Sequence, residues 1–117
     1  MKLSQILEQD IGYNEDLKKQ FHLKARTLLR KVAKAMNTEY DLRSCLGGIA
    51  VSGEVILHTP YVYVQVGQSS LGPGHAVLYR RCNGMKDYAG GPNQFTSVRQ
   101  VEDDPQAFAK FLNEAFL

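Results

Sequence analysis

The fold is decided by the stretch YVYVQVGQSSLGPGHAVLYRR, residues 61–81. Its first part places a valine at every second position, and this period of two indicates a strand with one face in the core. GQSSLGPG (67–74) is typical of a turn, and HAVLYRR (75–81) reads as the next strand. The connection is short and holds no helix of crossover length, so we expect the two strands to be antiparallel neighbours.

Further strands are expected on both sides of this pair. IAVSGEVILH (49–58) follows two glycines and is separated from the pair by Pro60. Residues 95–101 predict a short edge strand. The sheet should therefore contain three to four antiparallel strands.

Helices are expected at both ends of the chain. Residues 2–9 have the spacing of a short helix. Asn14 can cap a long second helix that ends near Asn37. Asp104 is a suitable cap for a final helix, and Pro105 suits its first position. The second helix has one apolar stripe, formed by Leu17, Phe21, Ala25, Leu28, Leu29, Val32 and Met36. We predict a single α+β domain over residues 1–117, with N-terminal helices, an antiparallel sheet and a C-terminal helix.

The charge of the chain is unevenly distributed. The net charge is +2, but residues 1–16 and 100–117 each carry −3, and residues 17–99 carry +8. The basic middle predicts an anionic partner such as nucleic acid or an acidic protein surface. The alternative is a solvated helix face paired with the acidic ends. No apolar run has the length of a membrane span, and the start does not resemble a signal peptide, so we expect a cytoplasmic protein without membrane contact.

Signatures of common enzymes and metal sites are missing from the sequence. There is no phosphate-binding GxxxxGK[ST], dinucleotide-binding GxGxxG, GxSxG, HExxH or CxxC. Possible metal ligands occur, but without the paired spacing of zinc sites; they are His22, Cys45, His58, His75 and Cys82. We expect no cofactor and no metal.

Cys82 is the basis of an enzyme hypothesis. Two arginines precede it and could favour its thiolate. His75 could act as base and Asp87 could orient it. Nothing in the sequence places these three residues together.

The most unusual segment is YRRCNGMKDYAGGPNQF, residues 79–95. It combines cations, amides and glycine-rich turns, which suits contacts with phosphate, with bases or with a protein surface. Alternation along a strand should send its two arginines to opposite faces. The alternative is a connection wrapped over the sheet, with Asp87 paired locally to Arg81. The candidate partner-binding residues are Arg80, Arg81, Lys86, Asp87, Tyr88 and Asn93.

The long helix offers a secondary basic surface at Arg26 and Arg30. Its bases could follow a nucleic-acid backbone, provided that they meet the basic residues of 79–95 in the fold. Tyr61 and Tyr63 on one sheet face could extend such a surface with aromatic rings, or they could lie under a helix.

The run YRRCNGMKDYAGGPN (79–93) resembles segments of small bacteriophage-encoded accessory proteins. The resemblance implies a protein that binds a host factor, a defence component or nucleic acid. Our first hypothesis is therefore a non-enzymatic inhibitor or modulator that occludes the surface of a host or defence protein. A nucleic-acid-binding accessory protein is the alternative, and a small enzyme with a cysteine nucleophile is the third reading.

Overall fold

The computed structural model describes residues 1–87 and 90–117. Within these residues, four helices and five strands follow one another, with one 3-10 turn before the fourth strand. The N-terminal part holds α1 (Leu3–Ile6), α2 (Glu15–Met36), β1 (Asp41–Cys45), β2 (Glu54–His58) and β3 (Val62–Gly67). After the turn η1 (Pro73–His75) come β4 (Val77–Arg81), β5 (Gln94–Thr96), α3 (Val98–Asp103) and α4 (Pro105–Phe116).

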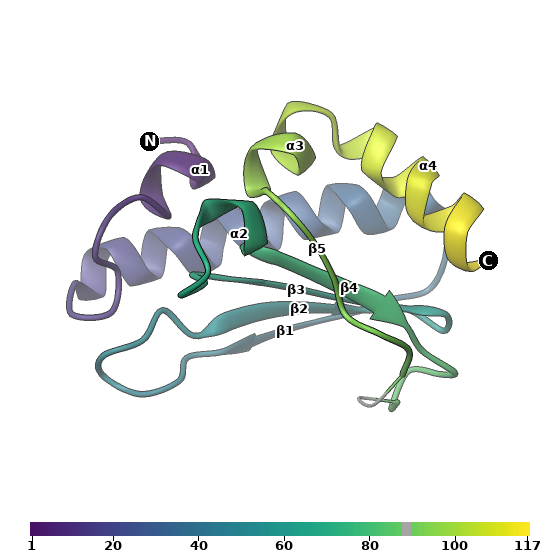
Figure 1. The fold of residues 1–117 in the computed structure, drawn as a ribbon, viewed down its shortest axis with the longest axis horizontal. Coiled ribbons are helices and arrows are strands. Elements are labelled where there is room, and N and C mark those ends of the chain that lie inside the picture. Colours follow the sequence, from purple (N-terminus) through teal and green to yellow (C-terminus); the bar gives the residue numbers. More distant parts are fainter. Residues whose placement is uncertain (88–89) are drawn as a thin grey trace.

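The strands form one antiparallel sheet in the order of the chain, β1-β2-β3-β4-β5. Figure 1 shows the helices on one side of this sheet, with α2 running along it beside α4. The predicted α+β class, with N-terminal helices, an antiparallel sheet and a C-terminal helix, is confirmed. No described helix is long and apolar enough to cross a membrane.

The sequence accounts for the beginning, the end and the buried face of helix α2. The Asn14 side chain accepts the Leu17 N–H at 3.0 Å, as an N-cap does. Asn37 ends the helix in the left-handed conformation, with φ at 58°. The apolar stripe is buried, with Phe21, Leu29 and Val32 fully inaccessible. Its burial against the sheet and α4 holds the helix layer in place.

The main core lies between the helices and one face of the sheet, here called the helix-side face. Alternate residues of β3, Val62, Val64 and Val66, point into it and are fully buried. Leu57 and Tyr79 join them from the neighbouring strands. The opposite face of the sheet, here called the outer face, is not covered by any of the described helices (Figure 1).

The sheet differs from the prediction in its edges. Strand β1 was not expected, and it raises the count from three or four strands to five. The strand predicted at 49–58 forms only from Glu54, because residues 46–53 make the connection to β1. The edge strand predicted at 95–101 covers only Gln94–Thr96, because Ser97 caps α3 by accepting the Gln100 N–H at 3.2 Å.

Candidate functional site

A row of paired residues crosses the outer face of four strands. Asp41 of β1 lies opposite His58 of β2, His58 opposite Tyr63 of β3, and Tyr63 opposite Arg80 of β4. His58 and Tyr63 are buried although none of the helices in residues 1–87 and 90–117 lies above them. Antiparallel pairing therefore gathers an acid, an imidazole, a phenol and a guanidinium on one surface.

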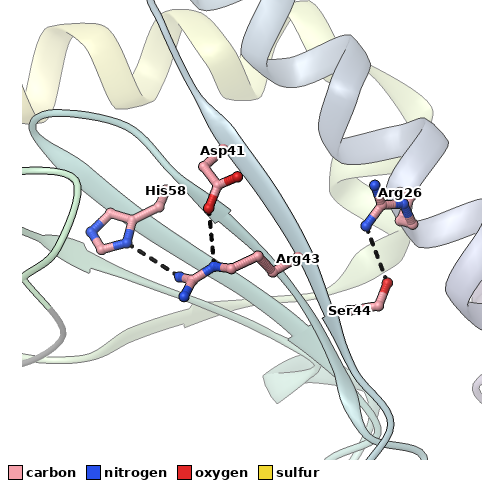
Figure 2. A network of polar contacts seen from close by, with 5 residues as sticks. All are labelled: Arg26, Asp41, Arg43, Ser44 and His58. Atoms are coloured by element: carbon pink, nitrogen blue, oxygen red, sulfur yellow. Dashed lines mark hydrogen bonds and ion pairs between the residues drawn. The ribbon is translucent and has the colours of Figure 1, made fainter.

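The first half of this row is held by Arg43 (Figure 2). Its Nε lies 3.1 Å from Oδ2 of Asp41, and its guanidinium approaches Nδ1 of His58 at 3.5 Å. Burial, and next the charge of Arg43, lower the pKa of His58, although hydrogen bonds to the backbone of Gly84 and Asp87 oppose the change. His58 is therefore neutral at pH 7 and acts as a fixed dipolar group.

The second half of the row is organised around Tyr63. The guanidinium carbon of Arg80 lies 4.1 Å from the centre of the Tyr63 ring, a cation–π contact. Arg80 also donates to Oδ1 of Asn93 at 3.0 Å. Burial raises the pKa of Tyr63, with Arg80 opposing this, so the phenol stays protonated. Two predicted candidates, Arg80 and Asn93, are thus in direct contact.

Backbone hydrogen bonds fasten the segment 82–93, here called the β4–β5 loop, to the sheet. The Cys82 N–H donates to the Tyr61 carbonyl at 3.0 Å, and the Gly91 N–H donates to the Arg81 carbonyl at 2.9 Å. Within the loop, the Asn83 N–H donates to Oδ2 of Asp87 at 2.9 Å. Asp87 therefore has a role in shaping the loop. Tyr88 lies outside the described residues.

Arg81 points away from Arg80, as alternation along a strand predicts. Its guanidinium donates to the carbonyls of Phe116 at 3.2 Å and Ala115 at 3.3 Å, at the carboxyl end of α4. This end carries the negative pole of the helix dipole. Arg81 thus fastens α4 to β4. Lys86 is exposed in the β4–β5 loop.

The geometry around Cys82 does not favour a nucleophile. Its side chain is buried, and Sγ donates to the Thr59 carbonyl at 3.3 Å. Burial raises the pKa of the thiol, so it is not a thiolate at neutral pH. His75 instead contacts the ring of Phe95, with ring centres 5.1 Å apart. Cys45 is exposed on β1, and neither cysteine is in a disulfide.

No group of three or more histidine, cysteine or acidic side chains within residues 1–87 and 90–117 is arranged to hold a metal ion. Cys82 lies close to the strand end that carries His58, since Sγ of Cys82 contacts the carbonyl of the next residue, Thr59. His22 is buried on α2, where Nε2 lies 2.9 Å from the Ser52 carbonyl oxygen.

The secondary basic surface lies on the helix layer but reaches the first strand. Arg26 donates to Oγ of Ser44 at 3.2 Å. Ser44 and Arg43 are neighbours on β1 with opposite orientations, so Arg26 and Arg43 flank this strand from its two sides (Figure 2). Arg30 follows one turn later on α2. The basic helix therefore approaches the outer face at the β1 edge.

Sequence reasoning did not consider Arg43, and it considered His58 only as a possible metal ligand, because the proximity of the two residues depends on a strand that was not expected. The aromatic surface considered for Tyr61 and Tyr63 does not form, because Tyr61 packs against the main core under α4 and Tyr63 belongs to the cluster on the outer face. Tyr61 precedes β3, and its hydroxyl donates to Oδ1 of Asn113 on α4 at 2.5 Å. No family model, curated protein or solved structure matches the chain.

Proposed function

We propose that the protein is a non-enzymatic binding protein whose outer face docks on the surface of a host or defence protein and occludes it. The observation that carries this proposal is the fixed position of Arg80, between the Tyr63 ring and Asn93, on the sheet face left open by the helices. The resemblance to phage accessory proteins suggests the class of partner.

The chemistry of this face suits a protein surface. Arginine and tyrosine are favoured anchors of protein interfaces. Apolar groups surround them: Ile56 and Leu78 belong to a small cluster separate from the main core, and Phe95 of β5 is 40% exposed. Lys86 and Asn93 add exposed polar groups at the margin. An anchored cation among apolar groups, with a polar rim, is the usual anatomy of an interface.

The test is affinity capture from bacterial lysate, and it compares variants of the outer face with a variant of the helix layer. Arg80→Lys keeps the charge but loses the planar group that stacks on Tyr63, and Lys86→Glu reverses an exposed charge. Lys31→Glu, at an exposed position of α2, is the matched reversal on the helix layer. We expect a captured protein that is retained by wild type and by Lys31→Glu and is reduced for both outer-face variants. Equal capture by all four proteins would refute the placement.

A second candidate function is nucleic-acid binding, favoured by the positions of Arg26 and Arg43 on either side of β1. Fluorescence anisotropy with labelled single-stranded DNA, duplex DNA and RNA tests it at low and physiological salt. Phosphate contacts predict binding that weakens steeply with salt and a smaller salt slope for Arg26→Glu. Binding that is absent at low salt excludes this function.

A further inference from the structure

A pocket with three aromatic walls opens between α4 and the edge strand β5. We call it the ring pocket. It has a volume of about 300 Å³ and is lined by Tyr79, Phe108 and Phe111, with Thr96, Gln100 and Asp104 at its polar side. It belongs to the helix layer, so it is separate from the outer face considered above. The volume is at the lower end for ligand sites, which suits a single side chain.

The three rings are arranged as a floor and two walls. The Tyr79 ring is perpendicular to both phenylalanines, with interplanar angles of 81° to Phe108 and 89° to Phe111 and centroids 5.7 Å away in each case. The two phenylalanine rings are nearly parallel, at 19°. Phe111 is 44% exposed although it belongs to this cluster. A guest in the pocket would therefore cover apolar surface that is now in water.

The electrostatics of the pocket select a cation. The faces of aromatic rings carry partial negative charge and attract cations. Asp104 adds a carboxylate at the mouth, where its Oδ1 accepts the Ala107 N–H at 3.0 Å as the cap of α4. No lysine or arginine lines the pocket within the described residues. Among cations, a guanidinium combines stacking on rings with planar contacts to a carboxylate.

The neighbouring strand indicates how such a side chain would be presented. β5 is the last strand of the sheet order, and within the described residues only β4 pairs with it. An edge strand can accept a further extended segment through backbone hydrogen bonds, with side-chain pockets providing selectivity. We propose that a partner segment lies along β5 as an additional strand and places an arginine side chain in the ring pocket.

The probe is the pentapeptide acetyl-Thr-Val-Arg-Val-Thr-amide, observed through the aromatic carbon–proton NMR signals of the intact protein. The control peptide contains citrulline, which has the shape of arginine without its charge. A third peptide is methylated on backbone nitrogens and cannot pair with an edge strand. We expect saturable shifts of the Tyr79, Phe108 and Phe111 signals with the arginine peptide, and much weaker binding of both controls. Equal binding of the arginine and citrulline peptides, or no binding, would overturn the proposal. Equal binding of the methylated peptide would overturn the pairing with β5.

Two variants complete the test. Asp104→Asn removes the charge but keeps an efficient N-cap, so α4 should stay folded and the arginine peptide should bind roughly two- to fivefold more weakly. Phe111→Leu keeps apolar volume but removes one ring, and we expect the peptide to lose most of its affinity. If both variants bind the peptide like wild type, the ring pocket is not the site.

Discussion

Gly90 is the residue on which the position of the β4–β5 loop depends most directly. A Cβ atom added at Gly90 would lie 1.8 Å from the carbonyl oxygen of Arg81 and 2.8 Å from its carbonyl carbon. The obstructing atoms are backbone of β4, and the same oxygen accepts the Gly91 N–H at 2.9 Å. Alanine therefore cannot be accommodated by a side-chain movement. The loop must move away from the strand.

The expected loss of stability follows from these contacts. Separation of the loop from β4 removes the Gly91 hydrogen bond, which contributes about 1 kcal/mol. Displacement of packed backbone adds roughly 1–3 kcal/mol, as in other cases of overpacking. We therefore expect Gly90→Ala to lower the free energy of unfolding by about 2–4 kcal/mol, a large effect for one methyl group.

Gly84→Ala is a matched control in the same loop. Apart from Gly84 and its two chain neighbours, no atom of residues 1–87 and 90–117 lies within 4 Å of a Cβ added at Gly84, and the φ of Gly84 is not positive. By restricting the unfolded chain, this substitution should be neutral or stabilise the fold by about 0.4–1 kcal/mol. Urea unfolding of wild type and the two variants gives the comparison. If Gly90→Ala lies within about 0.5 kcal/mol of Gly84→Ala, the loop is not fastened to β4 as described.

Two further predictions concern the contacts beside this loop. Arg81→Met should lower the free energy of unfolding by about 1 kcal/mol, because it removes a cation and two hydrogen bonds from the end of α4. This loss corresponds to a decrease of about 3–6 °C in the midpoint of thermal unfolding. The control Lys86→Met should leave the midpoint unchanged. A similar decrease for both variants would argue against the contact between Arg81 and α4. The free energy of unfolding should depend on pH because of His58. Folding lowers the pKa of His58 below the ordinary 6.5, so the unfolded chain binds the proton more readily than the folded one. The His58 contribution to stability should be constant above this ordinary pKa and should fall as the pH decreases through about 6.5. Urea unfolding at about pH 7.5 and about pH 5.5 should show a smaller loss of unfolding free energy for His58→Gln than for wild type. An equal loss would refute the assignment.

The parts of the fold that could be predicted are those with strong local signals. Helix α2 has caps and an apolar stripe, and β3 has strict alternation, so both were found close to their true limits. Strand β1 has the sequence DLRSC and a mostly exposed surface. It is a strand because β2 pairs with it, and this pairing cannot be recognised from the local sequence alone. Residues 98–103 contain Val98 and Val101 three apart, a spacing too short to separate helix from strand without the Ser97 cap.

The candidate site could be predicted only in outline. Composition identified the segment 79–95, and alternation correctly separated Arg80 from Arg81. The partners of these arginines come from distant parts of the sequence, Tyr63 for one and the end of α4 for the other. Such contacts depend on strand register and on helix packing, and neither is visible within the segment itself.

Strand β4 connects the two surfaces proposed for binding, because its consecutive residues serve different layers. Tyr79 forms the floor of the ring pocket, and Arg80 lies on the outer face. The Arg80 side chain is already ordered by a ring contact and a hydrogen bond, so a partner would lose little additional side-chain entropy on binding it. Lys86 is exposed and has no such preorganisation among its described contacts. Arg80 should therefore govern the rate of dissociation from a protein partner, whereas Lys86 at the rim should act mainly on the rate of association.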